Sequence, residues 1–289
     1  MGAICAAFGI SRQAHYQQQA RDAQRQREAA IILELVRLIR RKHPRMGGRK
    51  LLYKIQPMLA DQGLGVGRDR LFTLLREADL LVARQKSYRR TTWAGWFRAP
   101  NRLLGLTVER PNQVWVGDIT YLELQNNHFA YLFLLMDLFS RYIVGWQVAR
   151  SLATDGALDC LHMALTGLPS LPLSWIHHTD HGVQYTDHRY LDTLQSHHCL
   201  PSMGAVGNCY DNIFAERLNG ILKNEYALNR PFTDYQQVLP AAKEVIHLYN
   251  TDRPHLSLKL ATPLAVYSGA VTDVPCLHIP LLPVEAPIS

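Results

Sequence analysis

The chain has 289 residues, of which 47% are hydrophobic, with five cysteines and a formal net charge of +7. This length exceeds one typical domain and allows a sizeable buried core. The cysteines are scattered without a Cys-x-x-Cys pair, which argues against a disulfide framework and a zinc site. No apolar run reaches the roughly 18 residues of a membrane-spanning helix, so we expect no membrane partner.

The charge is unevenly distributed along the chain. Residues 1–110 carry 22 Lys and Arg against 8 Asp and Glu, a balance of +14, whereas residues 111–289 carry 9 against 16, a balance of −7. A basic amino-terminal part attracts the phosphate backbone of DNA and makes binding fall with salt. The alternative is an ordinary solvated basic surface. The acidic second part is consistent with a site that needs cations beside DNA.

The first 83 residues predict helices. Residues 1–27 are interpreted as a helical extension, in which Ser11 is placed to cap a helix. Residues 28–83 are interpreted as three short helices joined by glycine turns, a pattern typical of a helix-turn-helix-like DNA-binding domain. Arg68 and Arg70, at the start of the third helix, are the predicted DNA-facing residues. The alternative is a helical packing domain with exposed arginines.

Residues 84–110 show no sustained periodicity and are interpreted as a basic linker. Its aromatic residues, which include Trp93, Trp96 and Phe97, could stack on a DNA strand or pack the linker onto the following domain.

A catalytic-type core is predicted over residues 111–268, followed by a tail over 269–289. Three strands come first, and helices then alternate with short strands. This order predicts an α/β fold with a mixed sheet flanked by helices. The expected strands cover 114–124, 128–139, 141–149, a segment ending near 180, and 200–203, and the expected helices cover 155–168, 188–198 and 212–223.

Three carboxylates stand out within this core. Asp118 lies in a β-branched strand, Asp180 follows another short apolar strand, and Glu216 lies in an amphipathic helix. Taken singly, each could be a turn, a cap or an exposed residue. Brought together, they suit Mg²⁺, which prefers oxygen ligands, and a pair of such ions about 3.5–4 Å apart can catalyse in-line displacement at phosphorus.

Two neighbours of these carboxylates are candidate DNA contacts. Lys223 lies seven residues beyond Glu216, close to two helical turns, and could hold a phosphate beside the metal. An ordinary surface lysine is the alternative. His181 follows Asp180 and could contact phosphate, orient a metal ligand, or only shape the turn.

Five motifs occur in a fixed order along the chain. They cover Trp115–Tyr121, Asp137–Arg141, His178–Tyr185, Gly207–Glu216 and Tyr249–His255. Together they resemble the second-reading-frame transposases of the third family of bacterial insertion sequences, over roughly residues 30–268. Departures from the family pattern lie at Gly204–Val206 and at Arg217, and neither removes a carboxylate.

The resemblance implies a retroviral-integrase-like core with the ribonuclease H fold. It implies that Asp118, Asp180 and Glu216, with 35 residues between the last two, form a catalytic metal site that uses Mg²⁺, with Mn²⁺ as a substitute. Asn212, four residues before Glu216, joins Lys223, His181, Arg68 and Arg70 as a predicted DNA contact. Asp137 is expected to pair structurally with Arg141 rather than to bind metal.

The implied activity is cleavage of one strand at an element end, followed by joining of the exposed 3′ hydroxyl to another phosphodiester. The implied partners are terminal inverted repeats, target DNA, further copies of the chain in a synaptic complex, and a separate or fused first-reading-frame protein. The expected location is the bacterial cytoplasm, at the nucleoid. Two alternatives stay open: a nuclease that cuts without joining, and a catalytically inactive DNA-binding regulator.

Overall fold

The structure is a computed structural model that describes residues 11–83, 96–125, 128–168, 174–204 and 213–281. The chain divides into two compact units, Met1–Arg84 and Gln85–Ser289. The division lies one residue from the 83/84 boundary suggested by the sequence. Within the described residues, no helix is both long and apolar enough to span a bilayer.

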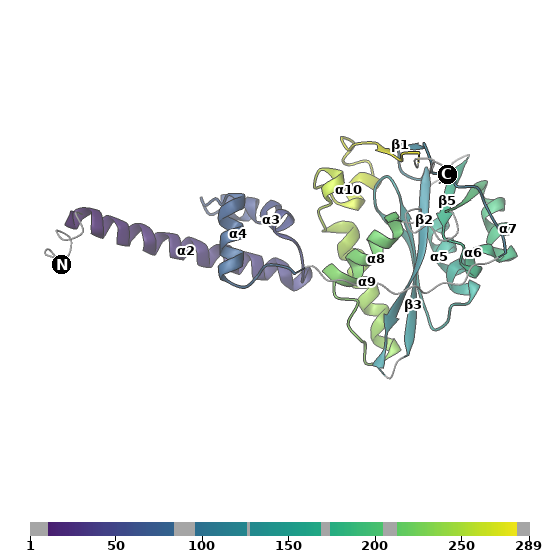
Figure 1. Ribbon diagram of the computed structural model, residues 1–289, viewed down its shortest axis with the longest axis horizontal. Coiled ribbons are helices and arrows are strands. Elements are labelled where there is room, and N and C mark those ends of the chain that lie inside the picture. The colour runs from purple at the N-terminus through teal and green to yellow at the C-terminus, as the bar shows by residue number, and fades with distance from the viewer. Residues whose placement is uncertain (1–10, 84–95, 126–127, 169–173, 205–212, 282–289) are drawn as a thin grey trace, which may run out of the picture. The chain divides into compact units, whose positions relative to one another are not determined.

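The first unit contains three helices: α2 (Arg12–Lys42), α3 (Gly48–Ala60) and α4 (Arg68–Glu77) (Figure 1). Ser11 caps α2, because its side chain accepts a 3.0 Å hydrogen bond from the backbone N–H of Ala14. The expectation of three short helices differs from the structure, since α2 is one helix of 31 residues that joins the predicted extension to the predicted first helix. No Gly or Pro interrupts this stretch, so no residue stops the helix.

An apolar cluster holds these three helices together. Val36, Leu51, Ile55 and Leu71 are fully buried within it. Gly48 permits the close approach of α3 and α4, because a Cβ atom at this position would lie 2.7 Å from the Phe72 ring. The unit therefore has its own small hydrophobic core, as an independently folded domain requires.

The second unit is built around a five-stranded sheet in the order β4-β3-β2-β5-β6. The strand β2 is antiparallel to β3, which is antiparallel to β4, whereas β5 runs parallel to β2 and β6 parallel to β5. The predicted mixed sheet is confirmed. The strands are β2 (Val114–Glu123), β3 (Phe129–Asp137), β4 (Ile143–Ala149), β5 (Trp175–Thr179) and β6 (Cys199–Met203).

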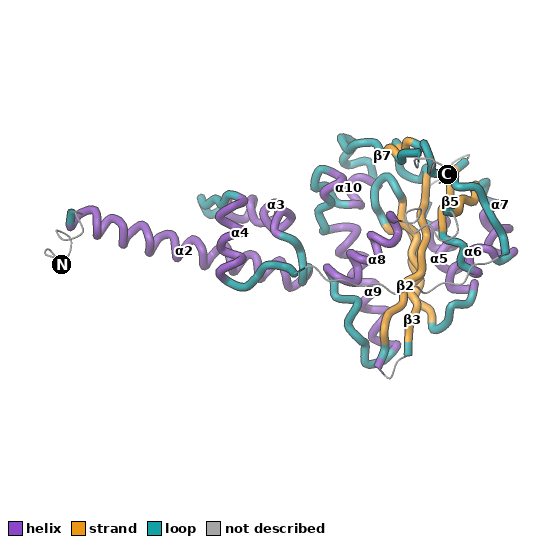
Figure 2. The backbone as a smooth tube through the Cα atoms, in the orientation of Figure 1, coloured by secondary structure: helices purple, strands orange, loops and turns teal. Residues whose placement is uncertain are grey.

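Helices cover both faces of this sheet, as Figure 2 shows with the strands between the two groups. One apolar cluster packs the sheet against α8 and α9, and the other packs it against α5 and α7. The α/β class with flanking helices is therefore confirmed. The helices are α5 (Thr154–Thr166), α6 (Val183–Thr186), α7 (His188–Ser196), α8 (Ile213–Glu225), α9 (Val238–Thr251) and α10 (Pro263–Tyr267), with 3-10 turns η3 (Tyr235–Gln237) and η4 (Leu256–Leu258).

The predicted linker and tail differ from expectation. The short strand β1 (Thr107–Val108) pairs antiparallel with β7 (Leu277–His278), so the two segments meet in a second, two-stranded sheet. Leu103 is buried in the core beside them. The apolar residues of 103–108 explain this packing better than a solvated linker does. Phe97 packs on the core, Trp96 is exposed, and Trp93 lies outside the described residues.

Candidate active site

The register of two parallel strands brings Asp118 and Asp180 side by side. Strand β2 pairs with β5 up to Val116 opposite His178. Asp118 lies two residues beyond Val116 and is still within β2. Asp180 lies two residues beyond His178, directly after the end of β5. Asp118 therefore lies in the central strand of the sheet, and Asp180 follows the strand beside it, as the labels β2 and β5 in Figure 1 show for the strands.

Asp118 is a half-buried carboxylate whose two oxygens both accept hydrogen bonds. The backbone N–H of Ile119 donates to Oδ1 at 2.9 Å, and Nδ2 of Asn219 donates to Oδ2 at 2.6 Å. The pKa of Asp118 is raised to about 8, first by burial and then by the negative charges of Asp180 and Glu216. A cation bound here would reverse that balance, because positive charge favours the ionised carboxylate.

Asp180 occupies the turn that follows β5. Its Oδ1 accepts a 2.9 Å hydrogen bond from the backbone N–H of Gly182. A Cβ atom at position 182 would lie 3.0 Å from the same oxygen, so a larger residue would crowd the carboxylate. The turn therefore holds Asp180 at the end of its strand while leaving its second oxygen without a hydrogen-bond donor among the described residues.

Helix α8 contributes three polar residues at helical spacing. Glu216, Asn219 and Lys223 follow one another by three and four residues, so they share one face of the helix. Lys223 is half-buried; burial lowers its pKa, whereas the charge of Asp118 raises it. Leu218 and Leu222 are buried on the other side of α8, which explains why the polar face turns toward Asp118.

The three carboxylates do not close into one metal-binding group. Among the side chains that the structure describes, no three His, Cys, Asp or Glu lie close enough together to hold a metal ion. Glu216 is exposed and acts on Asp118 only through its charge. The like charges of the three carboxylates repel one another, and a bound cation would offset that repulsion.

The Asn219 side chain fits a cation bound beside Asp118, although the sequence analysis did not single out this residue. Its Oδ1 is buried and has no hydrogen-bond partner among the described residues, an arrangement that buried polar atoms avoid. A water molecule on a nearby ion would satisfy this acceptor, and the surrounding oxygen donors suit Mg²⁺. Its position, three residues after Glu216, is the signal that could have found it.

The other predicted contact residues occupy different places. His181 lies beside Asp180, with its Nδ1 3.4 Å from Nη1 of Arg98. Arg68 and Arg70 are exposed at the start of α4, in the first unit. Asn212 lies outside the described residues.

Asp137 has a structural role. Its buried carboxylate accepts hydrogen bonds from the backbone N–H groups of Asn112 and Ser140, both at 2.7 Å. Burial raises its pKa to about 6, against the opposing effect of these bonds. The expected pairing with Arg141 occurs through the backbone, since the N–H of Arg141 donates to the carbonyl of Asp137 at 2.9 Å, and its guanidinium donates to the carbonyl of Leu138.

Comparison with known proteins identifies the family. Two family models, both described as an integrase core domain, match residues 108–209 and 197–263. The chain is 31% identical over 262 residues to the transposase for insertion sequence element IS629 of Shigella sonnei, covering 88% of this chain and 86% of that protein. The chain belongs to the insertion-sequence transposases. This chain is also 33% identical over 269 residues to an uncharacterized 31 kDa protein of insertion element IS600 of Shigella sonnei. That match covers 91% of this chain and 96% of the relative.

Solved structures similar to this chain include retroviral integrases. The HTLV-2 integrase catalytic core domain matches with a TM-score of 0.43 and 20% identity, over 55% of this chain and 97% of that one. The predicted family and the integrase-like core are confirmed by the family models and the curated relatives.

Proposed function

We propose that this transposase cleaves one DNA strand at each end of its insertion sequence and joins the exposed 3′ hydroxyl to another phosphodiester. The observation that carries the proposal is that Asp118 lies in β2 and Asp180 directly follows β5, the parallel strand beside it, which puts the two carboxylates side by side. The electrostatic influence of Glu216 on Asp118 supports assigning the third carboxylate to the same site. Membership of the transposase family supports DNA as the substrate.

The residues divide the chemistry among them. Asp118, Asp180 and Glu216 would hold divalent ions, with Mg²⁺ as the natural choice and Mn²⁺ as a substitute. When bound, a pair of such ions activates the attacking oxygen and stabilises the leaving oxygen. Lys223 would hold a phosphate next to Asp118, and His181 and Asn212 would contact the same DNA. No covalent bond between protein and DNA is needed.

The first unit would supply DNA affinity, and further chains would complete the assembly. Arg68 and Arg70 are exposed at the first turn of α4 and can reach phosphates or bases without rearrangement of the helical core. We propose that at least two copies of the chain bring the two element ends together. The proposed partners also include target DNA and a separate or fused first-reading-frame protein. The proposed location of the protein is the bacterial cytoplasm, at the nucleoid.

The test uses labelled DNA that carries the element's own ends. Wild type and Glu216→Gln are incubated with Mg²⁺, Mn²⁺ or a chelator, and nicked and joined products are separated by size. We expect joined product only from wild type with metal. Glu216→Gln should lose both cleavage and joining while its DNA affinity stays within about threefold, because an amide removes charge but little volume.

Other outcomes would select a different function. Metal-dependent nicks without joined product would favour a nuclease, and DNA binding without nicks under every condition would favour a regulator. Joining by Glu216→Gln at the wild-type rate would remove Glu216 from the metal site.

A further inference from the structure

The fifth sequence motif, Tyr249–His255, is buried although the proposed chemistry does not use it. It spans the end of α9 and the turn that follows. Tyr249 and Arg253 are only 1% and 3% exposed, and Asn250 is also buried. Buried polar groups need partners, so these side chains must be tied to neighbouring elements.

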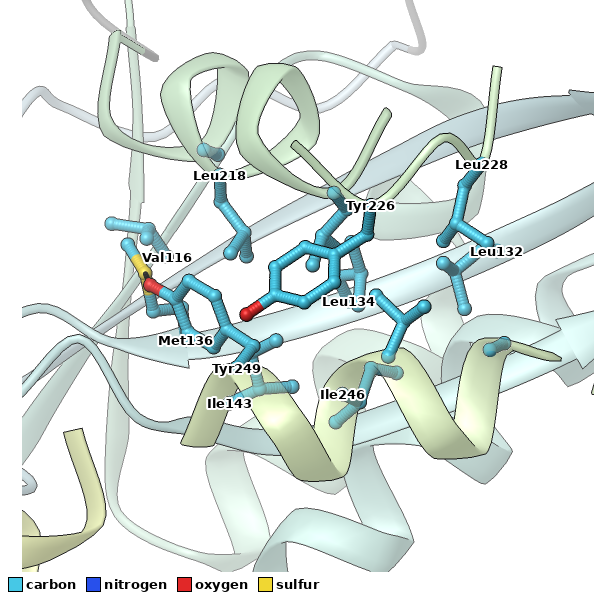
Figure 3. Close-up of a cluster of buried hydrophobic side chains, with 14 of the residues drawn as sticks. Val116, Leu132, Leu134, Met136, Ile143, Leu218, Tyr226, Leu228, Ile246 and Tyr249 are labelled. Atoms are coloured by element: carbon cyan, nitrogen blue, oxygen red, sulfur yellow. Dashed lines mark hydrogen bonds between the residues drawn. The ribbon is translucent and has the colours of Figure 1, made fainter. Parts of the chain in front are cut away.

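Two of these residues tie α9 to the sheet. Asn250 accepts a 2.9 Å hydrogen bond from the backbone N–H of Ile143 and donates to the carbonyl of Ile143 at 3.1 Å. This pair of bonds imitates the pairing of a further strand with β4. The Tyr249 hydroxyl lies 3.9 Å from Sδ of Met136 in β3, among the apolar side chains shown in Figure 3.

Arg253 then ties the motif to α8. Its Nε donates to Oε2 of Glu225 at 2.7 Å, and its Nη2 donates to Oε1 at 3.0 Å. The guanidinium also lies over the Tyr249 ring, with 5.6 Å between its central carbon and the ring centroid. Such a forked pair restricts orientation as well as distance, unlike a single charge-charge contact.

Glu225 is the last residue of α8, the helix that also carries Glu216, Asn219 and Lys223. Leu218 and Leu222 decide which face of α8 is buried, but apolar packing is not directional, so it resists sliding of the helix along the sheet less than a forked ion pair does. The pair contributes little net stability, because the cost of removing the Arg253 charge and part of the Glu225 charge from water offsets their attraction; the two side chains are 4% and 24% exposed. Nη1 of Arg253 is buried without a partner among the described residues, which adds to that cost. Orientation is therefore the better explanation for the pair.

We propose that Arg253 and Glu225 form a latch that positions α8, so that its polar face meets Asp118. Both are positioning residues, because they act through α8 and not on DNA. The inference rests on the proposed function, since it assigns the latch to the metal site described above.

The test separates positioning from stability. The main variant, Arg253→Met with Glu225→Leu, replaces both charges by apolar side chains of similar size, which commonly preserves folding. A second variant, Arg253→Glu with Glu225→Arg, exchanges the charges. The control is Lys259→Met, which breaks an exposed ion pair of 2.7 Å with Asp273 in the same unit. Thermal unfolding, Mn²⁺ binding by electron paramagnetic resonance without DNA, and joining rate against Mn²⁺ concentration are measured for each.

We expect the apolar double variant to unfold at nearly the wild-type temperature. Its joining rate should fall by about tenfold to a hundredfold, since small misplacements of catalytic groups cost that much. Its Mn²⁺ affinity should also fall by about fivefold, because displaced ligands weaken metal binding. The charge exchange should restore both quantities to within about threefold, and Lys259→Met should change neither.

Two results would overturn the latch. One is an apolar variant with wild-type joining and Mn²⁺ affinity, and the other is a lower rate that follows only the loss of folded protein, with Mn²⁺ affinity unchanged. If wild type binds Mn²⁺ but neither cleaves nor joins DNA, the proposed function fails, and the Mn²⁺ affinities of the variants still decide whether the latch exists.

Discussion

The two units use polar side chains in opposite ways. In the helical unit the candidate functional charges are exposed, as with Arg68, whose side chain is 62% exposed. In the core unit most of them are buried or half-buried, as with Asp118, which accepts a hydrogen bond from Asn219, and with Arg253, whose side chain is 4% exposed, whereas Glu216 is exposed. An exposed charge acts through its sign alone, whereas a buried one acts through its position. Substitutions should therefore change affinity in the first unit and chemistry or folding in the second.

The largest effect should follow replacement of Asp118. Asp118→Asn should lower cleavage and joining by about a thousandfold or more, because it removes a metal ligand from a group that works as a unit. The stability of the free protein should not fall, since burial already disfavours the ionised form of this carboxyl at neutral pH. Product formation and chemical denaturation are the two measurements.

Asp137→Asn is the matched control in the same sheet. The amide loses one acceptor where two backbone N–H groups now donate, so unfolding should become easier by about 1–3 kcal/mol. The folded fraction should keep its activity. A stable but inactive Asp137→Asn variant would assign Asp137 a catalytic role like that of Asp118 and would contradict its structural role.

The next effect concerns Lys223, which combines charge with partial burial. Lys223→Ala should raise the KM for end DNA by about tenfold, because one phosphate contact close to the metal site is lost. The control is Lys243→Ala, an exposed lysine of α9. Equal KM values for Lys223→Ala and wild type would assign Lys223 to the ordinary helix surface.

A smaller effect is expected for the helical unit. Arg68→Ala with Arg70→Ala should weaken binding to end DNA by severalfold and reduce the slope of affinity against salt by about 2, since each phosphate contact contributes about 0.9. Arg76→Ala, at the other end of α4, is the control. The metal dependence of joining should not change. An unaltered salt slope would favour the reading of this unit as a packing domain.

The same contrast explains what the sequence could predict. Strands β2 and β5 are recognisable because Asp118 lies within a β-branched run and Asp180 follows shortly after the apolar pair Trp175 and Ile176. Their parallel pairing cannot be recognised from the sequence, because the register depends on contacts between residues 62 positions apart, such as Val116 and His178. The placement of single carboxylates was therefore predictable, whereas their adjacency rested on family resemblance.

Residues with ordinary local sequence escaped prediction for a related reason. Asn219 is a common residue on a helix surface until Asp118 is placed opposite it. The pairing of β1 with β7 joins residues about 170 positions apart, and only two residues on each side take part. No local pattern reports such contacts, because tertiary packing and not intrinsic propensity selects them.

A pH-dependent effect on stability is confined to the core unit and leaves catalysis aside. His177 in β5 is 2% exposed, and burial lowers its pKa to about 3 from the ordinary value of 6.5. Because the folded-state pKa is the lower one, the unfolded chain takes up a proton first as the pH falls below about 6.5. The contribution of this histidine to stability is full above that pH and is lost toward pH 3. Between pH 7 and pH 5 the loss should be about 2 kcal/mol.

His177→Gln should remove this part of the pH dependence from the core unit. All five tryptophans lie at or after position 93, so tryptophan fluorescence during urea denaturation reports unfolding of that unit alone. The difference in unfolding free energy between wild type and variant should shrink as the pH falls from 7 to 5. The same change at exposed His162 is the control. Parallel curves for wild type and His177→Gln would mean that His177 takes up its proton in the folded state as readily as in water, so burial would not be the source of the acid sensitivity.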